Sequence, residues 1–72
     1  MYNMNKTFSQ AGKDILKFLL AECTPEQQLM FKRMYSPKDL NKDINAVVDD
    51  MDDSKIDHAI TQCENTVLKN NR

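Results

Sequence analysis

Hydrophobic residues near the amino end of the chain recur at the three- and four-residue spacing of a helix. The residues that follow this spacing are Phe8, Ala11, Ile15, Phe18 and Leu19. They predict an amphipathic helix over residues 8–23 with this face buried, preceded by a loose polar tail over residues 1–6. Gly12 is expected to weaken the first turns of the helix by up to about 1 kcal/mol relative to alanine.

The start of a second helix is predicted by the sequence Thr24-Pro25-Glu26-Gln27. The side chains of Thr24 and Gln27 can each bond the backbone amide of the other, and Pro25 suits the first helical position. We therefore predict a helix over residues 25–35. Its inward stripe is expected to be Phe31 and Met34 with either Met30 or Tyr35, and its outward residues are Lys32 and Arg33.

The third helix has two possible starts. Ser36-Pro37-Lys38-Asp39 repeats the start pattern and favours a helix over residues 38–51. Asn41 and Asp43 are also acceptable caps, so residues 36–42 can instead form a turn-rich connection before a helix that begins near Asp43. In both cases the apolar face is Leu40, Ile44, Val47, Val48 and Met51, or the later part of this set.

The last helix is predicted over residues 54–69, after the break at Asp52-Asp53-Ser54. Its apolar seam is Ile56, Ala59, Ile60, Cys63, Val67 and Leu68. The four helices are joined by short connections, which predicts an all-α fold, a compact four-helix bundle. Because the chain has only 72 residues, we expect residues 1–72 to form a single domain.

Composition narrows the class of protein further. The longest apolar run, Phe18-Leu19-Leu20-Ala21, is far too short for a membrane span, and the first residues do not resemble a secretory signal. Without such a signal, Cys23 and Cys63 are expected to be reduced thiols of a cytoplasmic protein. Ten basic and eleven acidic residues give a net charge of −1, which disfavours a general nucleic-acid binder.

Candidate catalytic and metal-binding groups are sparse. A calcium loop beginning at Asp50 would place Lys55 where glycine is needed and Thr61 where glutamate is needed. His58, the only histidine, and Cys63 are not at the spacing of a helical metal pair. We predict no enzyme activity, no metal and no cofactor; a metal or redox switch through Cys23, Cys63 and His58 is a minor alternative that thiol titration would test.

The second helix carries more large side chains than one narrow seam can bury. Adaptable methionine and tyrosine side chains at a surface often mark a partner site, although a core that surrounds this helix would also explain them. The candidate partner-binding residues are Met30, Lys32, Arg33, Met34 and Tyr35.

An acidic stretch precedes the last helix and forms a second candidate surface. Asp49, Asp50, Asp52 and Asp53 are placed where a basic partner could meet them. Acidic residues at helix ends also have a capping role, and this explanation comes first.

The stretches Thr24–Ser36, Val47–Met51 and Lys55–Ile60 resemble small proteins encoded in the early regions of lambdoid bacteriophages and related prophages. The resemblance covers about residues 15–69 and rests mostly on helix starts and core positions. It implies a small helical protein made in the bacterial cytoplasm early in infection, which adjusts host physiology or the choice between lysis and lysogeny. It supplies no catalytic residues.

The expected function is therefore that of a non-enzymatic interaction module that binds a host or phage protein, with a homodimer as a further mode of association. The alternative is a small DNA-associated transcriptional regulator, because Lys32, Arg33, Lys38 and Lys42 lie near the turn between the second and third helices. The acidic residues of the third helix would repel phosphates, which disfavours nucleic acid as the partner.

Overall fold

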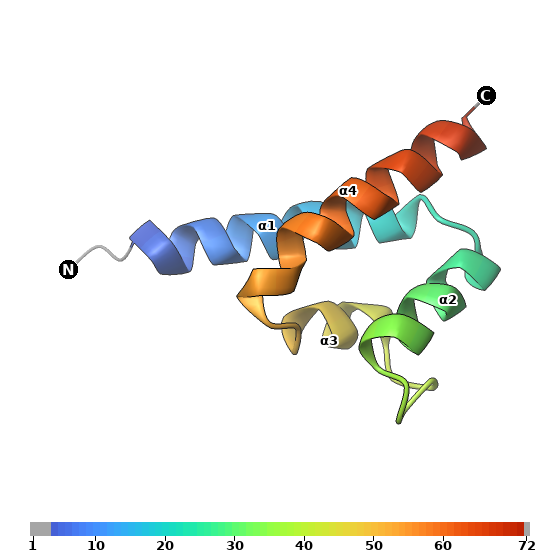
Figure 1. The fold of residues 1–72 in the computed structure, drawn as a ribbon, viewed down its shortest axis with the longest axis horizontal. Helices are drawn as coiled ribbons and strands as arrows, with labels where there is room; N and C mark the ends of the chain where they lie inside the picture. Colours follow the sequence, from blue (N-terminus) through green and yellow to red (C-terminus); the bar gives the residue numbers. More distant parts are fainter. Residues whose placement is uncertain (1–3, 72) are drawn as a thin grey trace.

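The computed structural model describes the backbone of residues 4–71 and the side chains of residues 10–71. Within this part of the chain the order of elements is α1 (Met4–Ala21), α2 (Pro25–Tyr35), α3 (Ile44–Asp49) and α4 (Asp53–Asn70). No strand occurs among the described residues, and the helices pack into one small globule (Figure 1). The all-α prediction is thereby confirmed.

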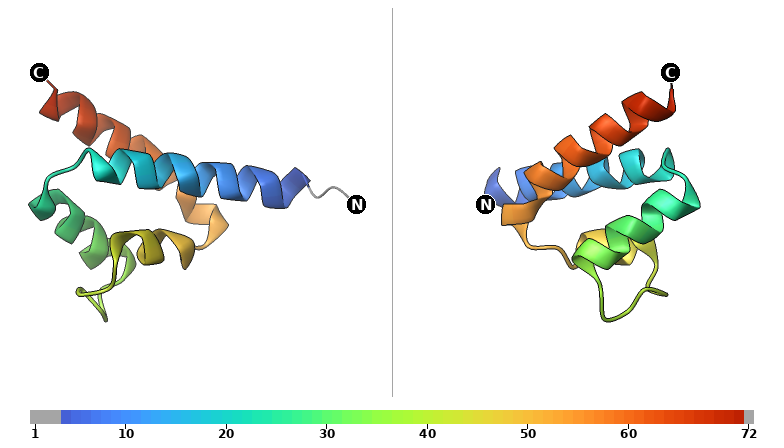
Figure 2. Two further views of the ribbon diagram at one scale, coloured as in Figure 1. Left: turned by 180° about the vertical axis from the view of Figure 1, so that it is seen from behind. Right: turned by 45° about the vertical axis from the view of Figure 1, so that its right-hand side comes forward.

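The two long helices, α1 and α4, cross each other and form one layer of the molecule (Figure 1). The shorter helices α2 and α3 lie together on one side of this pair, as both views in Figure 2 show. Helix α1 contacts both α4 and α3, while α2 packs mainly against α3. The backbone of α2 therefore lies closer to α3 than to α4.

The start of α2 follows the predicted chemistry. The Thr24 hydroxyl accepts from the Gln27 amide at 3.2 Å, and the Gln27 side-chain oxygen accepts from the Thr24 amide at 2.9 Å. Pro25 takes the first helical position. The end of α1 is satisfied at the same corner, because Gln28 Nε2 donates to the Leu20 carbonyl at 2.7 Å. The bounds of α2 are those predicted.

Helix α1 differs from its prediction in its start and in its buried face. It begins at Met4, so the expected tail is wrong for residues 4–6, and residues 1–3 lie outside the described part. Ile15 and Phe18 are 51% and 67% exposed, whereas Leu16 and Leu20 are buried. The side chain of Phe8 lies outside the described residues.

Gly12 explains which face of α1 is buried. A Cβ atom at this position would lie 3.0 Å from Cγ2 of Ile56, so α1 and α4 approach each other closely there. The face that carries Gly12, Leu16 and Leu20 therefore packs against α4, and the equally apolar face with Ile15 and Phe18 is left outside. Gly12 permits a helix crossing and is more than a weak point in a helix.

The core has contributions from all four helices and from the turn after α3. Its buried members are Leu16, Leu20, Phe31, Val47, Val48, Met51, Ile56, Ala59 and Cys63. Leu19, Tyr35, Ile44 and Ile60 pack against this cluster and are partly buried.

The predicted third helix over residues 38–51 is wrong, and the alternative of a turn-rich connection is correct. Helix α3 covers only Ile44–Asp49, and the Asp43 carboxylate caps it by accepting from the Asn45 amide at 3.1 Å. In the connection, the Asp39 carboxylate accepts from the Asn41 amide at 3.2 Å. Side chains of this kind bond nearby backbone and so compete with helix formation.

Helix α4 agrees with its prediction to within one residue at each end. The break before it is present, with Asp52 as the residue that precedes the first turn. No helix within residues 4–71 has the length and apolar character needed to cross a membrane.

Candidate functional site

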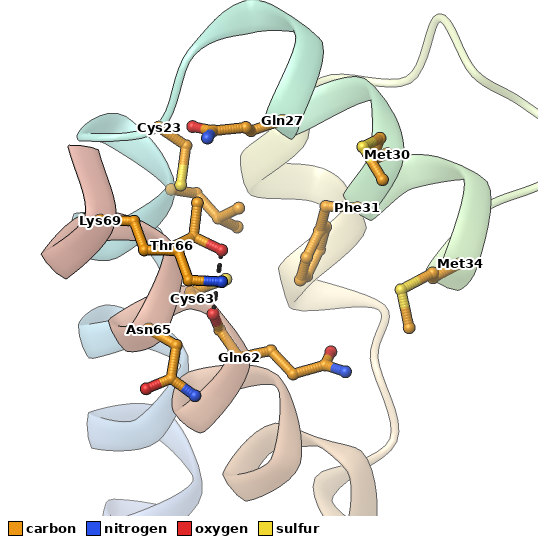
Figure 3. Close-up of a pocket in the computed structure, with 11 residues that line it drawn as sticks. Cys23, Gln27, Met30, Phe31, Met34, Gln62, Cys63, Asn65, Thr66 and Lys69 are labelled. Atoms are coloured by element: carbon orange, nitrogen blue, oxygen red, sulfur yellow. Dashed lines mark hydrogen bonds between the residues drawn. The ribbon is translucent and has the colours of Figure 1, made fainter.

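A groove lies between α2 and the carboxyl-terminal half of α4, with its floor at the end of α1 (Figure 3). It has a volume of about 340 Å³, which is within the range of natural ligand pockets. Its lining residues are Leu20, Cys23, Gln27, Met30, Phe31, Met34, Gln62, Cys63, Asn65, Thr66 and Lys69. We call this feature the α2–α4 groove.

The α2 wall of the groove is apolar. Met30 and Met34 are one helical turn apart, and 63% and 58% of their respective surfaces are exposed. Phe31, which is buried, lies between them in sequence and supplies apolar floor. Exposed methionines beside a buried aromatic ring form an adaptable apolar surface, because the unbranched thioether side chain can change its shape to suit a partner.

The α4 wall is polar. Gln62, Thr66 and Lys69 recur at helical spacing along the side of α4 that borders the groove (Figure 3). The Thr66 hydroxyl donates to the Gln62 carbonyl at 3.1 Å, which occupies the hydroxyl hydrogen within the helix. Lys69 is the one charged residue among those that line the groove, and no carboxylate of the described residues lies within ion-pairing distance of it.

Two side-chain amides, Gln27 of α2 and Asn70 of α4, join the two helices, and Gln27 is one of the residues that line the groove. Gln27 Nε2 donates to Asn70 Oδ1 at 3.0 Å, and Asn70 Nδ2 donates to Gln27 Oε1 at 2.8 Å. We call this pair the amide clasp. Gln27 Oε1 also accepts from the Thr24 amide, so one atom both starts α2 and ties it to the end of α4.

Two thiols border the floor of the groove. Burial raises the pKa of Cys63 from 9.0 to about 11, with the nearby Cys23 as a smaller cause. Burial also raises the pKa of Cys23, whose thiol donates to the Leu19 carbonyl at 3.4 Å. Protonated thiols react slowly, so the groove floor is neutral and chemically quiet at pH 7. No group of three or more metal-ligating side chains gathers within the described residues.

The structure separates the five residues predicted on α2. Met30 and Met34 line the groove, so the expectation that Met34 belongs to the inward stripe is wrong. Arg33 is exposed and Lys32 is half-buried.

Tyr35, expected on the exposed part of α2, instead packs against the core. Its ring centroid is 4.6 Å from that of Phe31. Burial raises the pKa of Tyr35, with Cys63 as a smaller cause. The face of α2 that carries Phe31 and Tyr35 is thus the inward one.

The acidic stretch lies at the connection between α3 and α4, at the opposite end of α4 from Lys69. Asp49 pairs with Lys17 at 2.7 Å, and its carbonyl accepts from Lys13 at 2.9 Å. Lys42 forms an ion pair with Asp50 and, by hydrogen bonding and charge, lowers the pKa of that carboxyl.

The other two acids of this stretch are also engaged at the start of α4. The Asp52 carboxylate accepts from the Ser54 hydroxyl at 3.1 Å. Asp53 lies in the first turn of α4, where its charge complements the helix dipole. The acidic stretch therefore serves contacts within the chain.

Sequence reasoning found the apolar half of the groove and missed the polar half. Gln62, Thr66 and Lys69 share one side of α4, but their pattern is also that of an ordinary solvated face. Gln27 was identified only for its role at the helix start, and no short-range pattern connects it with Asn70, 43 residues later. Comparisons with protein families, curated proteins and solved structures give no match to this chain.

Proposed function

We propose that this chain is a non-enzymatic interaction module that binds a helical segment of a partner protein in the α2–α4 groove. The observation that carries the proposal is the exposure of Met30 and Met34 beside Phe31 at a pocket of about 340 Å³. Long apolar side chains exposed next to one another are typical of partner sites.

The form of the groove favours a helical ligand over an extended one. Extended peptides commonly add a strand to the open edge of a sheet, and residues 4–71 contain no strand. The two walls are helices that present rows of side chains, Met30 with Met34 on α2 and Gln62 with Thr66 on α4. An amphipathic helix docks on such rows through its own side chains.

The same geometry gives no support to the alternative of a DNA-associated regulator. Of the four basic residues on which that alternative was based, Lys42 is paired with Asp50, and Lys13 and Lys17 of α1 are likewise engaged with Asp49. Helix α3 has six residues, which is short for a recognition helix in a major groove.

The partner class that we propose is a host or phage protein of the bacterial cytoplasm. This part of the proposal rests on the resemblance to small early proteins of lambdoid phages, carried by residues 24–36, 47–51 and 55–60. The effect of binding would be to modulate host physiology or phage development.

Affinity capture from bacterial lysate tests the proposal when the bait is changed at the groove alone. The test variant is Met30→Asp with Met34→Asp, which places two charges on exposed positions of the apolar wall. The matched control is Ile15→Asp with Phe18→Asp, which makes the same change on the exposed face of α1. Circular dichroism and thermal unfolding establish that both variants are folded.

The proposal requires that the captured protein is lost with the groove variant and kept with the α1 control. The identified protein must then bind the purified chain with the same dependence on the two variants. Equal capture by the wild type and the groove variant would rule out the groove as the binding surface, and loss with the α1 control alone would assign binding to α1.

A further inference from the structure

We infer that the ligand of the α2–α4 groove is an acidic amphipathic helix, whose apolar side chains meet Met30 and Met34 and whose carboxylate meets Lys69. The inference rests on the proposed function, because it specifies the chemistry of the partner at the same site. It follows from the arrangement of one apolar row, one polar row and one charge around a single groove.

The two walls set the amphipathic pattern of the ligand. Met30 and Met34 form the α2 row, and Gln62, Thr66 and Lys69 form the α4 row. A helix that lies between two such rows contacts each with a different side of its surface. Apolar residues at positions i and i+4 of the ligand would meet the methionines, and polar residues on the adjacent side would meet α4.

The charge of the groove selects an acidic ligand over a basic one. Lys69 carries the only charge among the lining residues, and within residues 10–71 no carboxylate pairs with it. Arg33 is exposed three positions after Met30, but it lies outside the residues that line the groove, so the charge argument rests on Lys69. The acidic residue nearest to Met30 along α2 is Glu26, which is not among the lining residues. It lies in the first turn of α2, where the helix dipole favours a negative charge.

A second copy of this chain is the competing occupant. The outer face of its α1 presents Ile15 and Phe18, with Asp14 and Glu22 on the same helix or directly after it. That face is apolar with acidic neighbours, so it has some of the chemistry that the groove selects. The experiment must therefore distinguish a separate peptide from self-association.

The probe is a pair of synthetic amphipathic peptides of about 15 residues, a length at which isolated helices become marginally stable. Both carry leucine at positions i and i+4; one has glutamates on the adjacent side and the other has lysines at the same positions. Binding is measured by fluorescence anisotropy at low and high salt, with amide chemical shifts to locate the peptide. Sedimentation of the chain alone at increasing concentration reports self-association.

The charge of position 69 is then reversed by Lys69→Glu, with Lys55→Glu as the matched control. Lys55 is exposed on the same helix but lies outside the groove lining. We expect the wild type and the control to prefer the glutamate peptide by about two- to fivefold, as a single exposed ion pair allows. The Lys69→Glu variant should lose or invert this preference, and high salt should weaken the preference in each case.

The outcomes separate this inference from the proposed function. If both peptides bind the groove equally and Lys69→Glu has no effect, the groove is a docking site but its charge selectivity is refuted. If neither peptide shifts the groove amides, the inference and the proposed function both fail. If the chain self-associates with its groove amides shifted and excludes the peptides, the second copy is the occupant and the inference is overturned.

Discussion

Helix α4 borders α1 and α2 in different ways. On the α1 side the backbones come close, with Gly12 against Ile56 and with Leu16 and Ala59 fully buried. On the α2 side the helices stay apart, and the space between them is the groove that Met30 and Met34 border. One side of α4 is thus closed by packing and the other is left open.

The difference shows how residue size decides which contacts a small protein completes. Glycine and alanine at a helix crossing let two backbones approach and exclude water. On the α2 side the facing residues include the longer side chains of Met30, Phe31 and Met34, and a groove remains between the helices. With 72 residues the chain has a small core, and α2 contributes only Phe31 to its buried members.

The largest expected effect concerns the closed side. Leu16→Ala should lower the free energy of unfolding by about 2–5 kcal/mol, because it leaves a cavity where the side chain is fully buried. Urea unfolding followed by circular dichroism measures the loss. Phe18→Ala, on the exposed face of α1, should change stability by only about 0.5 kcal/mol; comparable losses would show that the two faces of α1 were assigned wrongly.

A smaller effect is expected from filling the crossing. Gly12→Leu should destabilise the chain by about 1–3 kcal/mol, because even a Cβ atom would lie 3.0 Å from Ile56. Ala11→Leu is the control on the exposed side of the same helix and should be nearly neutral. A stabilising Gly12→Leu would mean that α1 and α4 are not in close contact. Thermal unfolding distinguishes the two cases.

On the open side the amide clasp is expected to contribute about 1 kcal/mol, since net hydrogen-bond contributions are of that size. Asn70→Ala removes both bonds to Gln27. Asn65→Ala removes another amide from the groove and leaves the clasp intact. We expect the first variant to unfold at lower urea concentration than the second; identical midpoints would deny the clasp any role in stability.

The last prediction concerns a pH dependence due to Cys63, which is seen only in alkali. Its pKa is raised from 9.0 to about 11 by burial, so between these values the unfolded chain loses the thiol proton while the folded chain keeps it. The contribution is complete below pH 9 and is lost as the pH rises toward 11. The free energy of unfolding should therefore fall more steeply over this range in the wild type than in Cys63→Ala. Parallel profiles would mean that the thiol titrates alike in both states.

Local chemistry explains which parts of the fold were predictable. The start and end of α2 follow from Thr24, Pro25 and Gln27, which act within one turn of each other. The seam of α4 was also recognised, since Ile56, Ala59 and Cys63 are buried as expected.

The incorrect predictions concern two places where the sequence allowed more than one local structure. Helix α1 has two apolar faces, and the buried one includes Gly12, which lies close to Ile56, 44 positions later. For α3 the competing starts were local, because the Ser36-Pro37 pattern and the acceptable caps Asn41 and Asp43 each allow a helix to begin.

Only the α2 wall of the groove could be predicted from the sequence. Methionines in excess of one helical seam indicate an exposed apolar wall, and this reasoning uses α2 alone. The polar wall and the clasp depend on how α2 lies relative to α4, which no pattern within either helix determines. The acidic stretch could be recognised in the sequence, but its partners Lys13 and Lys17 belong to α1 and could not be predicted from the stretch itself.

The dual use of the Gln27 side-chain oxygen has a consequence for how occupancy of the site is felt by the rest of the molecule. A ligand that separates the two helices at that end must break the bond from Asn70 to this oxygen, and any movement of the Gln27 side chain also disturbs its bond with the Thr24 amide. Separation of α2 from α4 at this end and fraying of the first turn of α2 both involve Gln27 Oε1, so we expect them to occur together. Solvent exchange at the amides of Thr24 and Gln27 would then report events several residues away from the methionines.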